Sequence, residues 1–112
     1  MLSPHSLWLV REPADIRAGI DSLTRLATQA AGHPPREGEA FLFTGKKRTR
    51  MKLLMWDGHG VWLCTRRLHQ GAFRWPRDGD TTWSLTAEQF AWLTAGVDWL
   101  RLSASPLQRW TE

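Results

Sequence analysis

The chain has 112 residues, 42% of them hydrophobic and 23% charged, and a formal net charge of +4, a composition typical of one soluble globular domain rather than a disordered chain. No apolar run approaches the ~20 residues that a membrane-spanning helix needs. The single cysteine, Cys64, excludes an internal disulfide, so we expect a protein of the reducing cytoplasm.

The first predicted elements are a short strand and an amphipathic helix. The apolar run Leu7–Val10 suits a strand, which Pro13 prevents from continuing. Asp15 suits the N-cap of a helix whose apolar residues recur at helical spacing, namely Ile16, Ile20, Leu23, Leu26, Ala27 and Ala30. Gly32 and the pair Pro34-Pro35 end this helix. We therefore expect its apolar side to lie on a sheet.

The centre of the chain is rich in predicted strands joined by short connections. Strands are expected over Glu39–Thr44, Met51–Trp56, Val61 to about Leu68, and Ala72–Trp75. Asp57-Gly58-His59-Gly60 indicates a tight turn, because glycine allows positive φ and aspartate can bond its own turn. The connections are too short for crossovers, so antiparallel pairing is expected. Both faces of Met51–Trp56 are mainly apolar, which predicts a central strand covered on both sides.

A second helix is predicted after the capping box Thr86-Ala87-Glu88-Gln89. Phe90, Leu93 and Val97 form its apolar stripe. The predicted fold class is α+β: an antiparallel meander sheet of about five strands with two packed helices. We expect one domain over residues 1–102 and a loose tail over residues 103–112.

Charge is distributed unevenly along the chain. Residues 46–77 hold nine basic side chains and one acid, Asp57, so this stretch carries +8 and the remainder −4. Such polarity favours a polyanionic partner, although a solvated face kept charged for solubility is the simpler alternative. In a meander, Lys46–Arg50 and Arg66-Arg67 converge on the sheet edge opposite the Asp57–Gly60 turn. The predicted nucleic-acid-binding residues, the last two at the margin, are Lys46, Lys47, Arg48, Arg50, Arg66, Arg67, Arg74 and Arg77.

Other functional classes have weaker signals. No metal site or cofactor is expected, because the possible ligands are scattered along the chain: His5, His33, His59, His69 and Cys64. Asp57 has no companion carboxylate and is better interpreted as a turn residue, so we do not expect an enzyme. Trp62 and Trp75 are near arginines and could stack on unpaired bases. Core positions are expected instead for three further tryptophans, Trp8, Trp56 and Trp92.

An ordered series of short motifs resembles a known family. The stretches that carry the resemblance are Asp15–Leu23, Gly38, Phe41–Phe43, Arg50–Gly58, Gly60, Arg67-Leu68, Gly71, Phe73, Trp75-Pro76, Leu85 and Gly96–Trp99. The chain resembles the small accessory protein of IS66-type bacterial insertion sequences. This is the product of the second reading frame, often called TnpB, and is distinct from the RNA-guided nuclease of that label. The resemblance covers roughly residues 7–100 and departs from the family at Ala18, usually lysine, at His69, often acidic, and at Trp62 and Cys64, usually tyrosine-like.

The resemblance implies a non-catalytic transposition factor that works beside a separate acidic-triad transposase. With the basic clusters, it predicts DNA binding of low selectivity, because phosphate contacts position a protein without specifying sequence. The expected partners are DNA, the transposase and other element-encoded proteins. The alternative is an adaptor that docks on the transposase or another accessory factor without contacting DNA, with tryptophans such as Trp99 or Trp110 as anchors. A third hypothesis is a small nuclease that uses Asp57 and His59.

Overall fold

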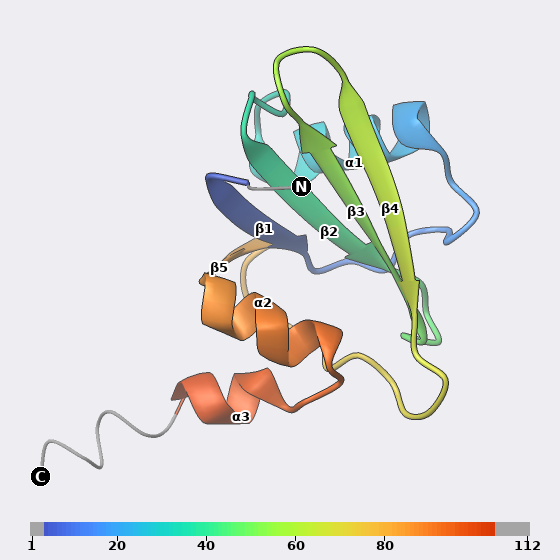
Figure 1. The fold of residues 1–112 in the computed structure, drawn as a ribbon, viewed down its shortest axis with the longest axis vertical. Helices are drawn as coiled ribbons and strands as arrows, with labels where there is room; N and C mark the ends of the chain where they lie inside the picture. The colour runs from blue at the N-terminus through green and yellow to red at the C-terminus, as the bar shows by residue number, and fades with distance from the viewer. Residues whose placement is uncertain (1–3, 105–112) are drawn as a thin grey trace, which may run out of the picture.

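The computed structural model describes residues 4–104, which form one mixed sheet covered by helices on both faces (Figure 1). The strands are β1 (Ser6–Val10), β2 (Glu39–Thr44), β3 (Arg50–Trp56), β4 (Val61–Arg67) and β5 (Thr82–Leu85). The helices are α1 (Ile20–Ala31), α2 (Ala87–Thr94) and α3 (Trp99–Ala104). The strand order is β4-β3-β2-β1-β5. No helix of the described range is long and apolar enough to cross a membrane.

The α+β class is confirmed, but the prediction of a purely antiparallel meander is wrong. β1 and β2 run parallel, with Trp8 opposite Phe41, while the other three pairings are antiparallel. The short central turns force antiparallel pairing, whereas the connection from β1 to β2 contains α1 and is long enough to cross over. α3 is a third helix that the sequence did not predict.

The predicted strand Ala72–Trp75 is also wrong, since the fifth strand is β5. The side chains of Phe73 and Trp75 are buried, but the segment contacts strand ends instead of joining the ladder. The Phe73 amide donates to the Arg48 carbonyl at 2.7 Å, and Trp75 Nε1 donates to the Val10 carbonyl at 2.9 Å. Burial of Phe73 and Trp75 therefore holds this segment against the sheet, although it does not pair with a strand.

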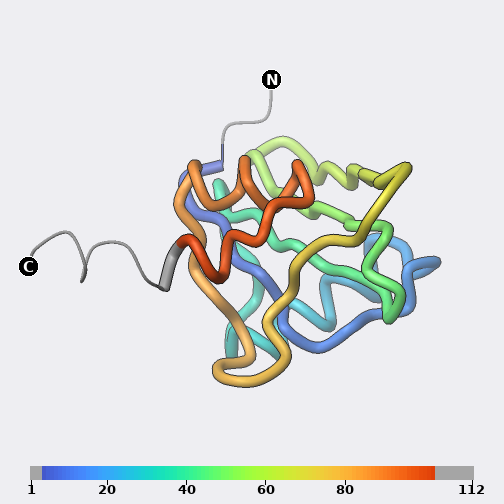
Figure 2. The backbone as a smooth tube through the Cα atoms, turned by 90° about the horizontal axis from the view of Figure 1, so that it is seen from below, coloured from blue at the N-terminus to red at the C-terminus, as the bar shows by residue number. Residues whose placement is uncertain are grey.

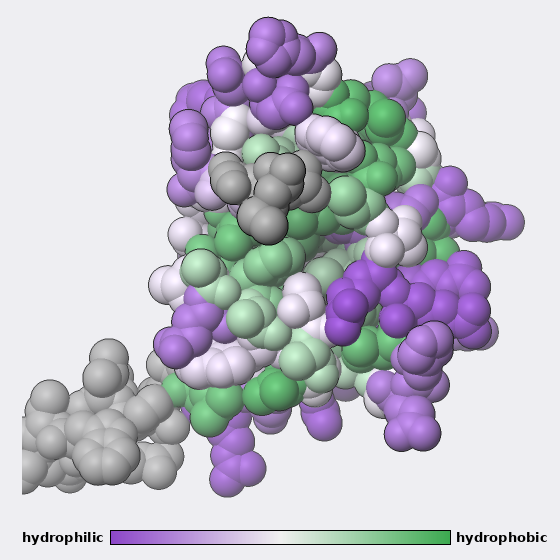
Figure 3. All heavy atoms as spheres, in the orientation of Figure 1, coloured by the Kyte–Doolittle hydropathy of each residue, from purple (hydrophilic) through white to green (hydrophobic). Residues whose placement is uncertain are grey.

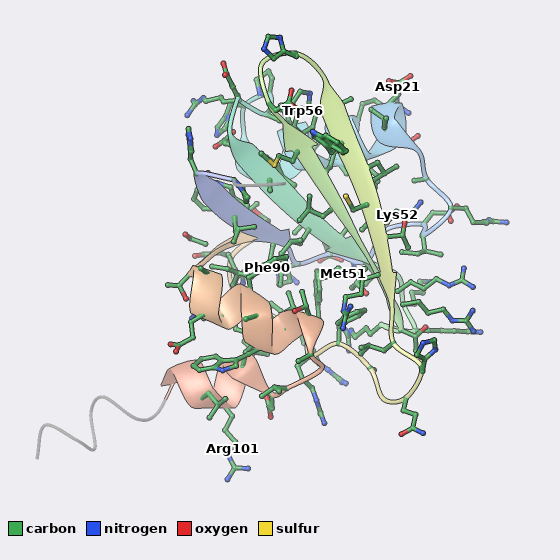
Figure 4. All side chains as sticks on the ribbon, viewed as in Figure 1. Asp21, Met51, Lys52, Trp56, Phe90 and Arg101 are labelled. Carbon is green, nitrogen blue, oxygen red and sulfur yellow. The ribbon has the colours of Figure 1, made fainter. Side chains whose placement is uncertain are left out.

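Strand alternation divides the core into two clusters, one on each face of the sheet. In the backbone view of Figure 2, the C-terminal helices lie on one side of the strands and the α1 segment lies on the other. One lies towards α2 and α3 and includes Leu42, Met51, Leu53, Leu93 and Trp99, with Phe90 packed against it. The other lies towards α1 and includes Leu23, Ala27, Phe41, Phe43 and Leu54. Figure 4 labels Met51 and Lys52, neighbours on β3 that serve opposite faces. The prediction that this strand is covered on both sides is confirmed, and Trp8, Trp56 and Trp92 pack against the core as expected.

The helix ends follow local hydrogen bonds. α1 begins at Ile20 with Gly19 as its N-cap, not at Asp15, whose carboxylate accepts the Arg17 amide at 2.9 Å within a preceding turn. Gly32, in the left-handed conformation, ends α1 as predicted. The capping box of α2 is confirmed, because the Gln89 amide donates to the Thr86 hydroxyl at 3.0 Å and the Thr86 amide to Gln89 Oε1 at 2.8 Å. α3 extends to residue 104; the rest of the predicted tail, residues 105–112, lies outside the described residues.

Candidate nucleic-acid interface

The register of β3 and β4 brings the two basic clusters together. Arg50 lies opposite Arg67, and Met51 lies opposite Arg66. The loop that carries Lys46, Lys47 and Arg48 precedes β3 at this same end, and the Asp57–Gly60 turn closes the other end (Figure 1). We call the surface formed by Lys46, Lys47, Arg48, Arg50 and Arg67 the basic end.

Arg50 and Arg67 form a close cross-strand pair of like charge. The Leu68 amide donates to the Thr49 carbonyl at 2.9 Å, so this neighbouring pair is hydrogen-bonded. Because hydrogen-bonded and non-hydrogen-bonded pairs alternate, Arg50 and Arg67 occupy the type of pair in which side chains approach more closely. Like charges directly opposite each other on neighbouring strands are destabilising. Folding alone therefore gives no reason for this pair.

Backbone hydrogen bonds give the basic loop a defined shape. The Arg48 amide donates to the Gly45 carbonyl at 3.1 Å, which closes a turn over residues 45–48. The Arg48 carbonyl in turn accepts the Phe73 amide. At the base of the loop, the buried Thr44 hydroxyl donates to the Arg50 carbonyl at 2.9 Å. The cations of the loop are thus presented on a fixed backbone.

A hollow of about 650 Å³ lies between the loop of residues 45–50 and the segment of residues 13–16, with Arg67 at its side. The two walls are joined where the Ala14 amide donates to the Thr44 carbonyl at 2.8 Å. They approach so closely that a Cβ on Gly45 would lie 3.3 Å from Ile16 Cβ. One acid, Asp15, lines this hollow, and its carboxylate forms an ion pair with Arg17 at 3.2 Å. The hydrogen bonds from the Arg17 side chain and amide lower the pKa of Asp15.

A second hollow of about 360 Å³ lies beside the first and shares Arg48 with it. The segment of residues 68–81 crosses this end of the sheet and brings Arg74 and Arg77 into the second hollow. Arg66 is set apart, because its Nε donates to the Thr94 carbonyl of α2 at 2.7 Å. The structure thus places seven of the eight predicted cations around two adjoining hollows and directs Arg66 towards a helix end.

Arg48 differs from the other cations of this surface. Its φ is +59°, and it is the one residue other than glycine with a positive φ within residues 4–104. That conformation is uncommon for a residue with a side chain. Its Nε is buried and has no hydrogen-bond partner in the described part of the chain. A buried donor without an acceptor costs about 1–3 kcal/mol, so both backbone and side chain carry an unfavourable term here.

The opposite end of the β3–β4 pair is satisfied internally. Asp57 Oδ1 accepts the amides of His59 at 3.0 Å and Gly60 at 2.9 Å, and Oδ2 accepts Trp62 Nε1 at 2.8 Å. The His59 amide, then the Trp62 indole and the Gly60 amide, lower the pKa of Asp57. The interpretation of Asp57 as a turn residue is confirmed. Both of its oxygens are engaged, and no group of three or more potential metal ligands occurs in the described range.

The tryptophans do not form a stacking surface at the basic end. Trp75 is 3% exposed, and Trp62, which is 51% exposed, lies at the Asp57 end of β4. Trp99 is 1% exposed and donates to the Arg74 carbonyl at 2.7 Å, so the prediction that it is an exposed anchor is wrong. Trp110 lies outside the described residues.

Comparison with known proteins shows the family to which the chain belongs. A family model described as IS66 Orf2 like protein matches residues 5–104, which include both hollows and the turn. The chain belongs to this IS66 Orf2-like family. It is similar to y4jC of Sinorhizobium fredii, an uncharacterized protein, with 33% identity over 95% of this chain and 91% of the relative. It is also similar to y4hO, an uncharacterized protein of the same organism, with 30% identity over 83% of this chain and 81% of the relative. No solved structure matches.

Membership of the IS66 Orf2-like family confirms the resemblance inferred from the motifs. It connects the chain with a mobile element and an accessory role in transposition. The sequence does not predict the wall of residues 13–16 or the conformation of Arg48. The motif Asp15–Leu23 predicts a helix, and its spacing carries no signal that its first residues face the basic loop.

Proposed function

We propose that the chain is a non-catalytic transposition accessory protein that binds DNA through its basic end. Lys46, Lys47, Arg50 and Arg67 contact phosphate groups of the duplex, and Arg74 and Arg77 extend the surface beyond Arg48. Contacts of this kind hold DNA with little dependence on its sequence. Site selection then belongs to the transposase with which the protein acts.

The observation that carries this proposal is that Arg50 and Arg67 lie opposite each other on neighbouring strands without an acidic partner. Within residues 4–104, the side chains of Lys46, Lys47, Arg50 and Arg67 have no hydrogen-bond or ion-pair partner in the chain itself. The ion pairs found in that range, Arg11–Glu12 and Arg17–Asp15, involve none of them. In Figure 3, hydrophilic side chains gather around the lower end of β4. A polyanion relieves the repulsion among these cations and releases its own counterions.

The test measures binding of fluorescently labelled duplexes, one an element end and one unrelated, over a series of salt concentrations. We expect comparable affinity for both and a linear log–log salt dependence with a slope of about −0.9 for each phosphate neutralised. The double variant Lys46→Ala/Lys47→Ala should bind more weakly, and the magnitude of its log–log salt slope should be lower by about 1.8.

The matched control is Arg25→Ala/Arg36→Ala, which removes the same charge from two exposed residues outside the basic end. Equal weakening by both double variants would mean that net charge, and not this surface, attracts DNA. A binding constant that does not change with salt would refute the proposal directly.

A second candidate function rests on Trp62. Its indole is half-exposed, yet its Nε1 is held by Asp57, which is itself held by two amides of the turn. An exposed aromatic ring that is already ordered loses little entropy on binding, and such rings are frequent anchors of protein interfaces. We infer an adaptor surface here, to be tested by co-purification of the transposase after nuclease treatment. The variant Trp62→Ala should reduce recovery at least tenfold if this ring is the anchor.

A further inference from the structure

The hollow of the basic end and the second hollow beside it meet at Arg48, and backbone hydrogen bonds hold this residue from both sides. Its amide donates to Gly45 within the hairpin loop, and its carbonyl accepts Phe73 from the crossing segment. The residue is therefore fixed between two parts of the chain that are distant in sequence. Arg48 lines both hollows.

The conformation of Arg48 opposes its residue type. A φ of +59° favours glycine, and glycine here would avoid the crowding between Cβ and the backbone. Its guanidinium Nε, moreover, is buried without an acceptor among residues 4–104. Strained backbone and an unsatisfied buried donor at the same residue are typical of a functional position, because the surrounding structure must hold both in place.

The surroundings of Arg48 define the chemistry of the missing acceptor. Lys46, Lys47, Arg50 and Arg67 line the first hollow, and Arg74 and Arg77 line the second. Each hollow includes one acid, Asp15 and Asp98 respectively, and Asp15 is already paired with Arg17. An anion is the ligand that this field attracts. A phosphate matches the planar fork of a guanidinium, which can donate two parallel hydrogen bonds to it.

We propose that Arg48 is the anchor for one phosphate group of the bound DNA, at the junction of the two hollows. This inference rests on the proposed DNA-binding function and assigns different roles within it. The exposed lysines contribute screened charge, whereas Arg48 forms directed hydrogen bonds from a preorganised backbone. The phosphate accepts hydrogen bonds from the guanidinium once the side chain turns its buried Nε towards the hollows, and the sugar-phosphate backbone continues from the first hollow towards Arg74 and Arg77.

The test compares four proteins on one labelled duplex at fixed salt: the unchanged chain, Arg48→Gly, Arg48→Lys and the neighbour control Lys47→Gln. Arg48→Gly should weaken binding by roughly 10- to 100-fold, the value of hydrogen bonds to a charged group. Its melting temperature should equal or exceed that of the unchanged chain, because glycine suits the backbone. Arg48→Lys keeps the charge without the fork and should recover only part of the loss. Lys47→Gln should cost no more than about threefold, as an exposed charge does.

Each outcome decides between the claims. If Arg48→Gly and Lys47→Gln weaken binding equally, or if Arg48→Lys binds as well as the unchanged chain, the anchor role is refuted while DNA binding stands. If the unchanged chain binds no duplex, the proposed function fails instead. Inorganic phosphate is the second arm. Stabilisation of the unchanged chain, but not of Arg48→Gly, by millimolar phosphate without any DNA binding would assign the site to a free phosphate compound and overturn the DNA assignment.

Discussion

The two ends of the β3–β4 pair place charged groups in opposite situations. At the turn, the carboxylate of Asp57 accepts three hydrogen bonds from residues within five positions of it. At the basic end, Arg50 and Arg67 face each other with no acid between them, and Arg48 holds a donor without an acceptor. We call the Asp57–Gly60 turn the closed end of the strand pair, because its charged group has its hydrogen bonds within the fold. We call the basic end the open end, because its charged groups lack such partners.

The contrast between the two ends separates charge that stabilises the fold from charge that is available to a ligand. A charged group whose hydrogen bonds are all made within the fold stabilises the fold and has little left for a partner. A group that is ordered but unsatisfied gains most when a ligand of opposite charge arrives. Net charge alone does not make this distinction, because both situations occur within the same stretch of +8.

The largest effect should come from the residue that supports both ends. Leu54 is fully buried in β3, opposite Phe41 on one side and Leu63 on the other. Leu54→Ala should lower the free energy of unfolding by about 2–5 kcal/mol and speed hydrogen exchange at both ends of the pair. Denaturant titration and site-resolved exchange measure this, with Leu54→Met as the volume-conserving control. Faster exchange at one end only would show that the ends are independent units.

A smaller effect should loosen the open end alone. Thr44→Val removes the buried hydroxyl that donates to the Arg50 carbonyl, at a cost of about 1 kcal/mol. Amide exchange should rise in the loop of residues 45–50 and stay unchanged at the Asp57–Gly60 turn. Thr44→Ser keeps the hydroxyl, so exchange should not rise selectively in the loop, although loss of the buried methyl group lowers the overall stability by about 0.8 kcal/mol. If the turn also loosens, the hydroxyl supports the whole pair.

The closed end should show a pH dependence that the open end lacks. The pKa of Asp57 is lowered below 3.8 in the folded chain, so its ionised form stabilises the fold. That contribution is complete above the unfolded-state pKa and is lost as the pH falls through the folded-state pKa. The difference in melting temperature between the unchanged chain and Asp57→Asn should therefore stay constant from neutral pH down to the ordinary aspartate pKa of 3.8 and shrink as the pH falls below it.

The subtraction in that experiment is necessary because Asp15 also has a lowered pKa and titrates in both proteins. DNA affinity of Asp57→Asn at neutral pH should equal that of the unchanged chain. Weaker binding by this variant would show that the closed end takes part in binding.

The smallest effect should come from one exposed charge. Lys46→Gln should leave the melting temperature unchanged and lower the magnitude of the log–log salt slope by about 0.9. The control Arg36→Gln removes one exposed positive charge outside the basic end and should leave the slope unaltered. An unchanged slope for Lys46→Gln would remove this residue from the interface.

Features that depend on neighbouring residues could be predicted from the sequence. The Asp57 turn and the capping box of Thr86 and Gln89 each join residues at most five positions apart. The tight turn also determined the register, and with it the convergence of Arg50 and Arg67. These bonds form between groups that the chain already holds close together, so composition at fixed spacing is a sufficient signal.

Features that depend on distant segments could not be predicted in this way. The parallel pairing of β1 and β2 arises from a crossover whose direction a short-range pattern does not encode. Residues 13–16 face the basic loop because the Ala14 amide finds the Thr44 carbonyl. Arg48, which is in the left-handed conformation, accepts the amide of Phe73, a residue 25 positions away that the sequence pattern predicts in a strand. Tertiary contacts, not local preference, determine each of these.

The position of β1 has a consequence for the growing polypeptide on the ribosome. β1 is synthesised first, yet it lies between β2 and β5. Val10 can pair with Thr82 only after β5 has been synthesised. The β2–β3–β4 hairpins have near neighbours in sequence and can form early. Until β5 emerges, β1 presents an open edge of the kind through which nascent chains associate. Translation that stops before Thr82 should thus release fragments that aggregate, although they already contain the whole basic loop.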